Sequence, residues 1–79
     1  MDFIIPWKNH LIPLECKSTL TAKSSHLGGV IDFMKTYNSP IGILVSLAPM
    51  ELRIISEKWK VLMLPLYLIE KWREIVEGI

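Results

Sequence analysis

The chain has 79 residues, a length that allows one small domain with a thin hydrophobic core. Hydrophobic residues make up 51% of it and charged residues 22%, which excludes a disordered chain and leaves more apolar surface than such a core can cover. We therefore expect self-association as a homo-oligomer. The net charge of +1 excludes the basic excess that drives autonomous binding to nucleic acid, so a nucleic-acid partner would need a local patch.

Three features of the sequence bear on location. Cys16 is the single cysteine and cannot form an intramolecular disulfide, which fits a reducing compartment. Asp2 stands where a secretory signal would carry positive charge. The most apolar run, residues 61–69, is short of the roughly 20 residues that a membrane helix needs. We expect a cytoplasmic protein without a membrane partner.

Two strands are predicted at the start of the chain. Residues 2–5 are apolar and β-rich, and Pro6 begins a turn. Residues 11–18 form the second strand, which alternates from Ile12 onward. The core side of this strand carries Ile12, Leu14 and Cys16, and the polar side carries Pro13, Glu15 and Lys17.

A loop and a helix follow. Residues 19–25 are small and polar, and Ser24 or Ser25 can N-cap a helix that ends at Asn38. The predicted buried stripe of this helix is Leu27, Val30, Ile31, Met34 and Tyr37. Two glycines, Gly28 and Gly29, each cost roughly 1 kcal/mol relative to alanine inside a helix, so we expect a later start or a close packing partner there.

The second half of the chain predicts further strands and a final helix. Residues 41–48 are almost continuously apolar, as in a central strand covered on both faces. Residues 51–56 and 58–63 are two shorter strands around a turn at Glu57. Pro65 fits the first turn of the last helix. Its apolar stripe is Leu68, Ile69, Trp72, Ile75, Val76 and Ile79. The prediction is one α/β domain over residues 1–79, with a mixed sheet of four to five strands and two helices.

Asp2, Glu15 and Lys17 are the candidate site. A tight connection between the first two strands would bring all three to one end of an antiparallel pair. Two carboxylates can hold Mg or Mn, and the backbone carbonyl of Cys16 offers another ligand. Such a metal polarises a phosphate and activates water, while the lysine stabilises developing charge. The same spacing also fits an ordinary solvated face with an exposed Glu15–Lys17 ion pair.

The residue pattern around this site resembles a known superfamily. Ile-Pro-Leu-Glu-Cys-Lys-Ser at residues 12–18, preceded by Asp-Phe-Ile-Ile and followed by a helix and a buried strand, resembles the PD-(D/E)XK nucleases. The likeness extends to the domain of unknown function at the C-terminus of prokaryotic AAA+-type ATPases, through residues 33–37, 42–47 and Met-Leu-Pro-Leu-Tyr-Leu at 63–68. It implies a restriction-endonuclease-like core with Asp2, Glu15 and Lys17 as catalytic residues. It also implies Asp2, Glu15 and the Cys16 carbonyl as metal ligands.

The chain also departs from that pattern. In the superfamily a helix precedes the strand that bears the aspartate, and in the ATPases a nucleotide-binding domain precedes that helix. Neither is present in this sequence, nor is a phosphate-binding loop, so we expect a truncated domain that uses no nucleotide. Three hypotheses follow: a domain fragment without robust activity alone, a Mg-dependent nuclease that cleaves DNA, and a small protein-interaction or dimerisation module.

The remaining reactive side chains have structural interpretations. The alternation makes Cys16 a small buried hydrophobe rather than a nucleophile. His10 and His26 fit surface or capping positions, because no second ligand stands at metal-binding spacing. The tryptophans, which are expected to pack rather than to stack on bases, are Trp7, Trp59 and Trp72. The lysines that form either a solvated face or a modest basic rim are Lys8, Lys17 and Lys23.

Overall fold

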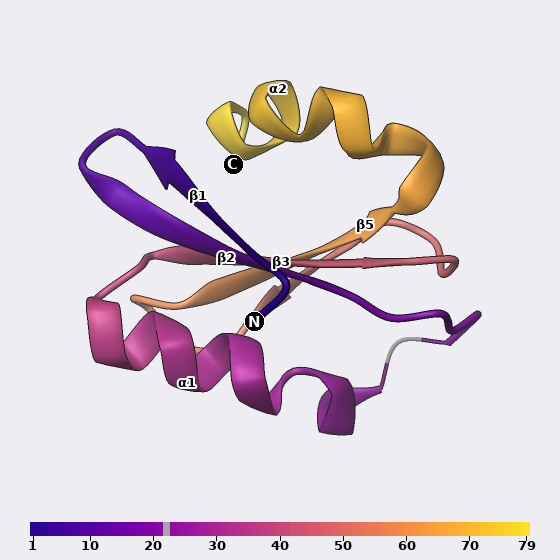
Figure 1. Ribbon diagram of the computed structural model, residues 1–79, viewed down its shortest axis with the longest axis horizontal. Helices are drawn as coiled ribbons and strands as arrows, with labels where there is room; N and C mark the ends of the chain where they lie inside the picture. Colours follow the sequence, from indigo (N-terminus) through magenta and orange to yellow (C-terminus); the bar gives the residue numbers. More distant parts are fainter. Residues whose placement is uncertain (22) are drawn as a thin grey trace.

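A five-stranded mixed sheet with a helical layer on each face makes up the fold (Figure 1). The computed structural model of the protein describes residues 1–21 and 23–79. The strands are β1 (Phe3–Trp7), β2 (His10–Cys16), β3 (Ile41–Ser46), β4 (Glu51–Ile54) and β5 (Lys60–Pro65). The helical segments are the 3-10 turn η1 (Ser24–His26), α1 (Gly28–Tyr37), the 3-10 helix η2 (Leu66–Lys71) and α2 (Trp72–Glu77). The order β-β-α-β-β-β-α confirms the predicted α/β class.

The strands lie in the order β1-β2-β3-β5-β4. The outer pairs, β1 with β2 and β4 with β5, are antiparallel, whereas β3 pairs in parallel with both of its neighbours. Lys8 and Asn9 connect β1 to β2 with φ values of 46° and 65°, the positive angles that a two-residue hairpin of type I′ requires. The carboxyl ends of β2, β3 and β5 therefore lie at the same end of the sheet.

α1 covers one face of the sheet. The core on this side consists of Leu27, Val30, Met34, Leu44, Val61 and Met63. Gly42 on β3 lets α1 approach closely, because a Cβ at this position would lie 2.4 Å from Val30 Cγ1 and 2.7 Å from Met34 Sδ. Ser39, in the connection from α1 to β3, is fully buried, and its hydroxyl donates to the Leu11 carbonyl. These contacts fix α1 across β2 and β3.

η2 and α2 cover the opposite face. The core on this side consists of Ile12, Leu14, Ile41, Ile43, Val45, Leu62, Leu64 and Val76. Trp7 and Trp72 pack against it, and Trp59 packs against the core under α1, which confirms their packing role. All six residues of β3 are buried, as its apolar run predicted. No helix of the described residues has the length and apolar character needed to cross a membrane.

Several boundaries differ from the prediction. β1 continues through Pro6, which an outer strand tolerates because the missing N–H belongs to the unpaired side. Pro65 ends β5 and precedes η2, so its placement inside the last helix was wrong. α1 starts at Gly28 after the η1 turn, and no serine side chain caps it. The later start that the glycine pair indicated is confirmed.

The predicted end of α1 is confirmed, whereas the predicted burial of two side chains was wrong. α1 ends where predicted, with Asn38 in the left-handed conformation that asparagine tolerates. Tyr37 was predicted to be buried but is 58% exposed, where it stacks on Phe33 with ring centroids 4.5 Å apart. Pro13 was assigned to the polar side of β2 but is buried, because α1 covers that side of the strand. The predicted loop over residues 19–25 includes residue 22, which lies outside the described residues.

Candidate functional site

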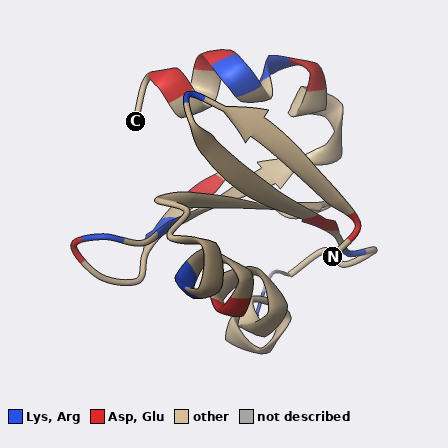
Figure 2. Ribbon diagram, turned by 60° about the vertical axis from the view of Figure 1, so that its left-hand side comes forward, with Lys and Arg blue, Asp and Glu red and all other residues tan. Residues whose placement is uncertain are grey.

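Asp2 lies beside the carboxyl end of β2, next to the Glu-Cys-Lys segment at residues 15–17. The Cys16 amide donates to Asp2 Oδ2 at 2.8 Å. In the β1–β2 register, Phe3 lies opposite Leu14, so Cys16 lies two residues beyond the last position of β2 that pairs with β1. The carboxylate of Asp2 thus accepts the hydrogen bond that a longer β1 would accept through its backbone. In Figure 2, acidic and basic ribbon segments meet beside the N-terminal end of the chain.

The backbone of Cys16 faces Asp2 rather than the centre of the sheet. Lys17 N donates to Val45 O at 2.9 Å, which turns the backbone of Lys17 toward β3. Because backbone groups alternate in direction along a strand, both the N–H and the carbonyl of Cys16 point toward β1. The carbonyl predicted as a metal ligand therefore lies on the same side of β2 as the carboxylate of Asp2.

The side chain of Glu15 projects from the α1 face and is half-buried beside the first turn of α1. A Cβ added to Gly29 would lie 3.7 Å from Glu15 Oε2. The N-terminal end of a helix carries partial positive charge and attracts a carboxylate. A distance of 3.7 Å is an ordinary van der Waals contact, and a Cβ at Gly28 would meet no atom within 4 Å, so Glu15 does not require glycine at either position.

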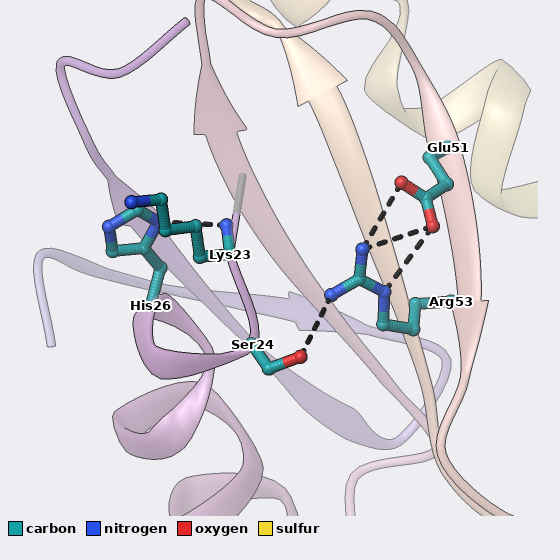
Figure 3. Close-up of polar contacts among 5 residues, drawn as sticks. All are labelled: Lys23, Ser24, His26, Glu51 and Arg53. Carbon is teal, nitrogen blue, oxygen red and sulfur yellow. Dashed lines mark hydrogen bonds and ion pairs between the residues drawn. The ribbon is translucent and has the colours of Figure 1, made fainter. Parts of the chain in front are cut away.

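Lys17 shares the α1 face of β2 with Glu15 and is exposed. Within the described part of the chain, neither residue takes part in an ion pair, so the predicted Glu15–Lys17 pair does not form there. The ion pair that does form joins Arg53 Nη2 to Glu51 Oε2 at 3.1 Å on β4. Arg53 also donates to Ser24 Oγ at 3.5 Å and ties β4 to η1 (Figure 3).

The Cys16 thiol was predicted to be buried, and this was wrong: Cys16 is exposed. Its side chain does point to the face that η2 and α2 cover, but they leave a hollow of about 200 Å³ at the end of β2, lined by Cys16, Ser46, Leu47 and Leu66 among others. Partial burial, and then the negative charges of Asp2 and Glu15, raise the pKa of the Cys16 thiol. The negative charges of both carboxylates therefore disfavour the thiolate form of the same cysteine.

The predicted basic rim does not form as one group, and both histidines occupy structural positions. Lys8 lies in the β1–β2 turn, at the opposite end of β2 from Lys17, so Lys8, Lys17 and Lys23 do not form one basic rim. His26 Nδ1 accepts a hydrogen bond from Lys23 N at 3.1 Å, which confirms its capping role (Figure 3). His10 starts β2 and is exposed.

The described residues form no enclosed metal site at this end of β2. Among residues 1–21 and 23–79, no group of three or more His, Cys, Asp or Glu side chains is arranged to hold a metal. Mg²⁺ usually keeps several waters and binds one or two protein carboxylates, which Asp2 and Glu15 can supply together with the Cys16 carbonyl. The arrangement can therefore support an open cation site.

Comparisons with family models, with curated proteins and with solved structures find no match to this chain. The fold alone defines its class, a small α/β domain with a five-stranded mixed sheet and two helices in the order β-β-α-β-β-β-α.

Proposed function

We propose that the chain is a restriction-endonuclease-like module whose Asp2–Glu15 carboxylate pair binds Mg²⁺ or Mn²⁺, and which has no robust nuclease activity alone. The observation that carries this proposal is the 2.8 Å hydrogen bond from the Cys16 amide to Asp2, because it holds one carboxylate next to the strand position that bears the other. The resemblance of residues 2–5 and 12–18 to the PD-(D/E)XK pattern gives the pair its chemical interpretation.

Each residue of the site has a separate role. Asp2 and Glu15 bind the cation, and the Cys16 carbonyl adds a neutral oxygen. Lys17 is free of ion pairs within the described residues, so its ammonium is available to a phosphate oxygen. A bound cation of this kind polarises a phosphodiester and lowers the pKa of its water. Two carboxylates hold such an ion weakly, which is why we expect little cleavage by the chain alone.

The test is a calorimetric titration of the folded protein with MgCl₂ and with MnCl₂. We expect saturable binding in the wild type, and its loss in Glu15→Gln and Asp2→Asn, which keep the side-chain shape and remove the charge. Glu57→Gln is the matched control, because Glu57 is an exposed carboxylate in the distant β4–β5 turn and its loss should leave binding unchanged. A folded wild type that binds neither metal would refute the proposal.

Nuclease assays on DNA and RNA then separate binding from cleavage. We expect at most weak, metal-dependent cleavage that Glu15→Ala and Lys17→Ala both abolish. Cleavage that persists in Glu15→Ala would identify a contaminating enzyme rather than this site. Robust cleavage by the wild type that both variants abolish would contradict the proposed lack of activity while supporting the metal site.

A further inference from the structure

β4 is an edge strand, and among residues 1–21 and 23–79 no strand pairs with its outer side. It is the last strand in the sheet order, and the side chains of Met50, Leu52 and Ile54 are 52%, 38% and 66% exposed. An unpaired strand that carries apolar side chains is a template for another strand. The question is which strand the edge of β4 fits.

The backbone groups on the free edge of β4 belong to Leu52 and Ile54. Ile55 N donates to Trp59 O at 2.9 Å, so the N–H of Ile55, just after β4, points toward the segment that leads into β5. Lys60, which lies opposite Ile54, donates instead to Pro40 O at 3.1 Å on the β3 side, so Ile54 and Lys60 form a non-hydrogen-bonded pair. Since the two kinds of pair alternate in an antiparallel ladder, the N–H and carbonyl groups of Leu52 and Ile54 point outward.

The opposite edge of the sheet is protected. The two-residue turn makes Trp7 and His10 the closing hydrogen-bonded pair, so the backbone groups of Ile4 and Pro6 face outward on β1. Pro6 has no N–H to donate, and proline on an edge strand blocks the addition of another strand. Only the β4 edge combines a complete set of outward backbone groups with exposed apolar side chains.

The charges of β4 select a second copy of the same strand and one register. With Leu52 opposite Leu52 of the second copy in an antiparallel pair, Glu51 faces Arg53 of the other copy twice. Sliding the pair by two residues, which moves its centre from Leu52 to a neighbouring residue, places Glu51 opposite Glu51 or Arg53 opposite Arg53, and like charges directly opposite each other are destabilising. The charges fall in the non-hydrogen-bonded positions, where cross-strand side chains lie closest.

We propose that this protein forms a two-fold symmetric dimer through antiparallel β4–β4 pairing centred on Leu52, which joins two sheets into one of ten strands. The pairing buries Leu52 against its copy and Ile54 against Met50 on the face where these side chains are exposed. On the α1 face it joins two Glu51–Arg53 ion pairs, drawn for one chain in Figure 3, into a network of four charges.

Charge reversal tests the register. By light scattering, the wild type should approach twice the 9.1 kDa mass of the chain as its concentration rises to about 1 mM. Arg53→Glu and Glu51→Arg should each weaken the dimer by about tenfold, because each places like charges opposite one another. The double variant Glu51→Arg/Arg53→Glu should restore it. Circular dichroism checks folding, and Glu51→Arg retains the Arg53–Ser24 contact.

Disulfide crosslinking tests the geometry in a Cys16→Ser background. A cysteine at position 52 would lie opposite its copy at a Cα separation of about 5.5 Å, within disulfide range. Leu52→Cys should therefore form a covalent dimer under mild oxidation. Ile54→Cys is the matched control and should not, because position 54 faces position 50. A wild type that stays at 9.1 kDa, single variants that dimerise like the wild type, or equal crosslinking at both positions would overturn the proposal.

Discussion

The thiol of Cys16 and the carboxylate of Glu15 project from opposite faces of β2. Even so, both Asp2 and Glu15 act on this cysteine. Asp2 bonds to the Cys16 amide, and both carboxylates contribute to the raised pKa of the thiol. The reactivity of Cys16 is therefore a measure of the site that requires no metal.

Removal of either acidic charge should lower the pKa of Cys16 and speed its alkylation. A thiol reacts as its thiolate, which nearby negative charge disfavours. We expect Asp2→Asn and Glu15→Gln each to increase the rate of reaction with iodoacetamide at pH 8 by about twofold, and to move the pH–rate profile to lower pH. Cys16 is the single cysteine, so the measured rate belongs to one site.

The control for this experiment is Glu57→Gln, which removes a distant charge and should leave the profile unchanged. An unchanged profile in both Asp2→Asn and Glu15→Gln would show that the carboxylates do not act on the thiol in solution. That outcome would also remove the evidence that both carboxylates lie close to Cys16, and would weaken the case for a shared cation site.

The residue alternation predicted which face Cys16 points to but not whether that face is covered. Coverage depends on where η2 and α2 lie, and the sequence of β2 holds no information on their placement. The proximity of Asp2 to Glu15 was predictable from a tight hairpin. The hydrogen bond that fixes Asp2 was not, because it depends on the β1–β2 pairing stopping at Leu14, two residues before Cys16.

At the scale of elements, the contact between α1 and β3 depends on the absence of a side chain at Gly42. Gly42→Ala should destabilise the fold by about 2 kcal/mol, because the new methyl group overlaps Val30 and Met34 and forces them to shift. Chemical denaturation followed by circular dichroism measures the change.

Gly28→Ala is the matched substitution for this prediction. A Cβ there meets no atom within 4 Å, so alanine should stabilise the start of α1 by about 0.5 kcal/mol through its better helix propensity. Equal effects of the two substitutions would mean that the close approach at Gly42 is relieved at no cost.

Element types were predictable because their hydrophobic periods differ, whereas two boundaries were not. Pro65 fits both a strand end and a first helical turn, and the pairing of β5 with β3 through Ser46 decides between them. The serines before α1 are good capping residues, yet the chain enters the helix through a 3-10 turn in which His26 caps Lys23 instead.

At the scale of the whole molecule, one face of the sheet depends on η2 and α2 for its cover. Trp72→Ala should cost about 3 kcal/mol, a large part of the roughly 5 kcal/mol that stabilises a domain of this size. Lys71→Ala, an exposed neighbour, should change stability by less than about 0.5 kcal/mol. Thermal unfolding followed by circular dichroism and by tryptophan fluorescence measures both variants.

The two probes also test whether the layers unfold together. The cores on the two faces share the strands of one sheet, so loss of the α2 layer should unfold the α1 layer in the same transition. Separate transitions would show that the α1 layer is stable alone. The sequence predicted two helices and a mixed sheet, but not that β5 lies between β3 and β4, because strand order in space does not follow from order along the chain.

The parallel pairing of β3 has a consequence for the kinetics of folding. Both outer pairs are local: a two-residue turn joins β1 to β2, and a short loop joins β4 to β5. β3 has no local partner, because α1 separates it from β2 and β4 separates it from β5. Hairpins form quickly and distant pairings must first overcome loop-closure entropy. We therefore expect the two hairpins to form early and the rate-limiting step of folding to be the docking of β3 between them.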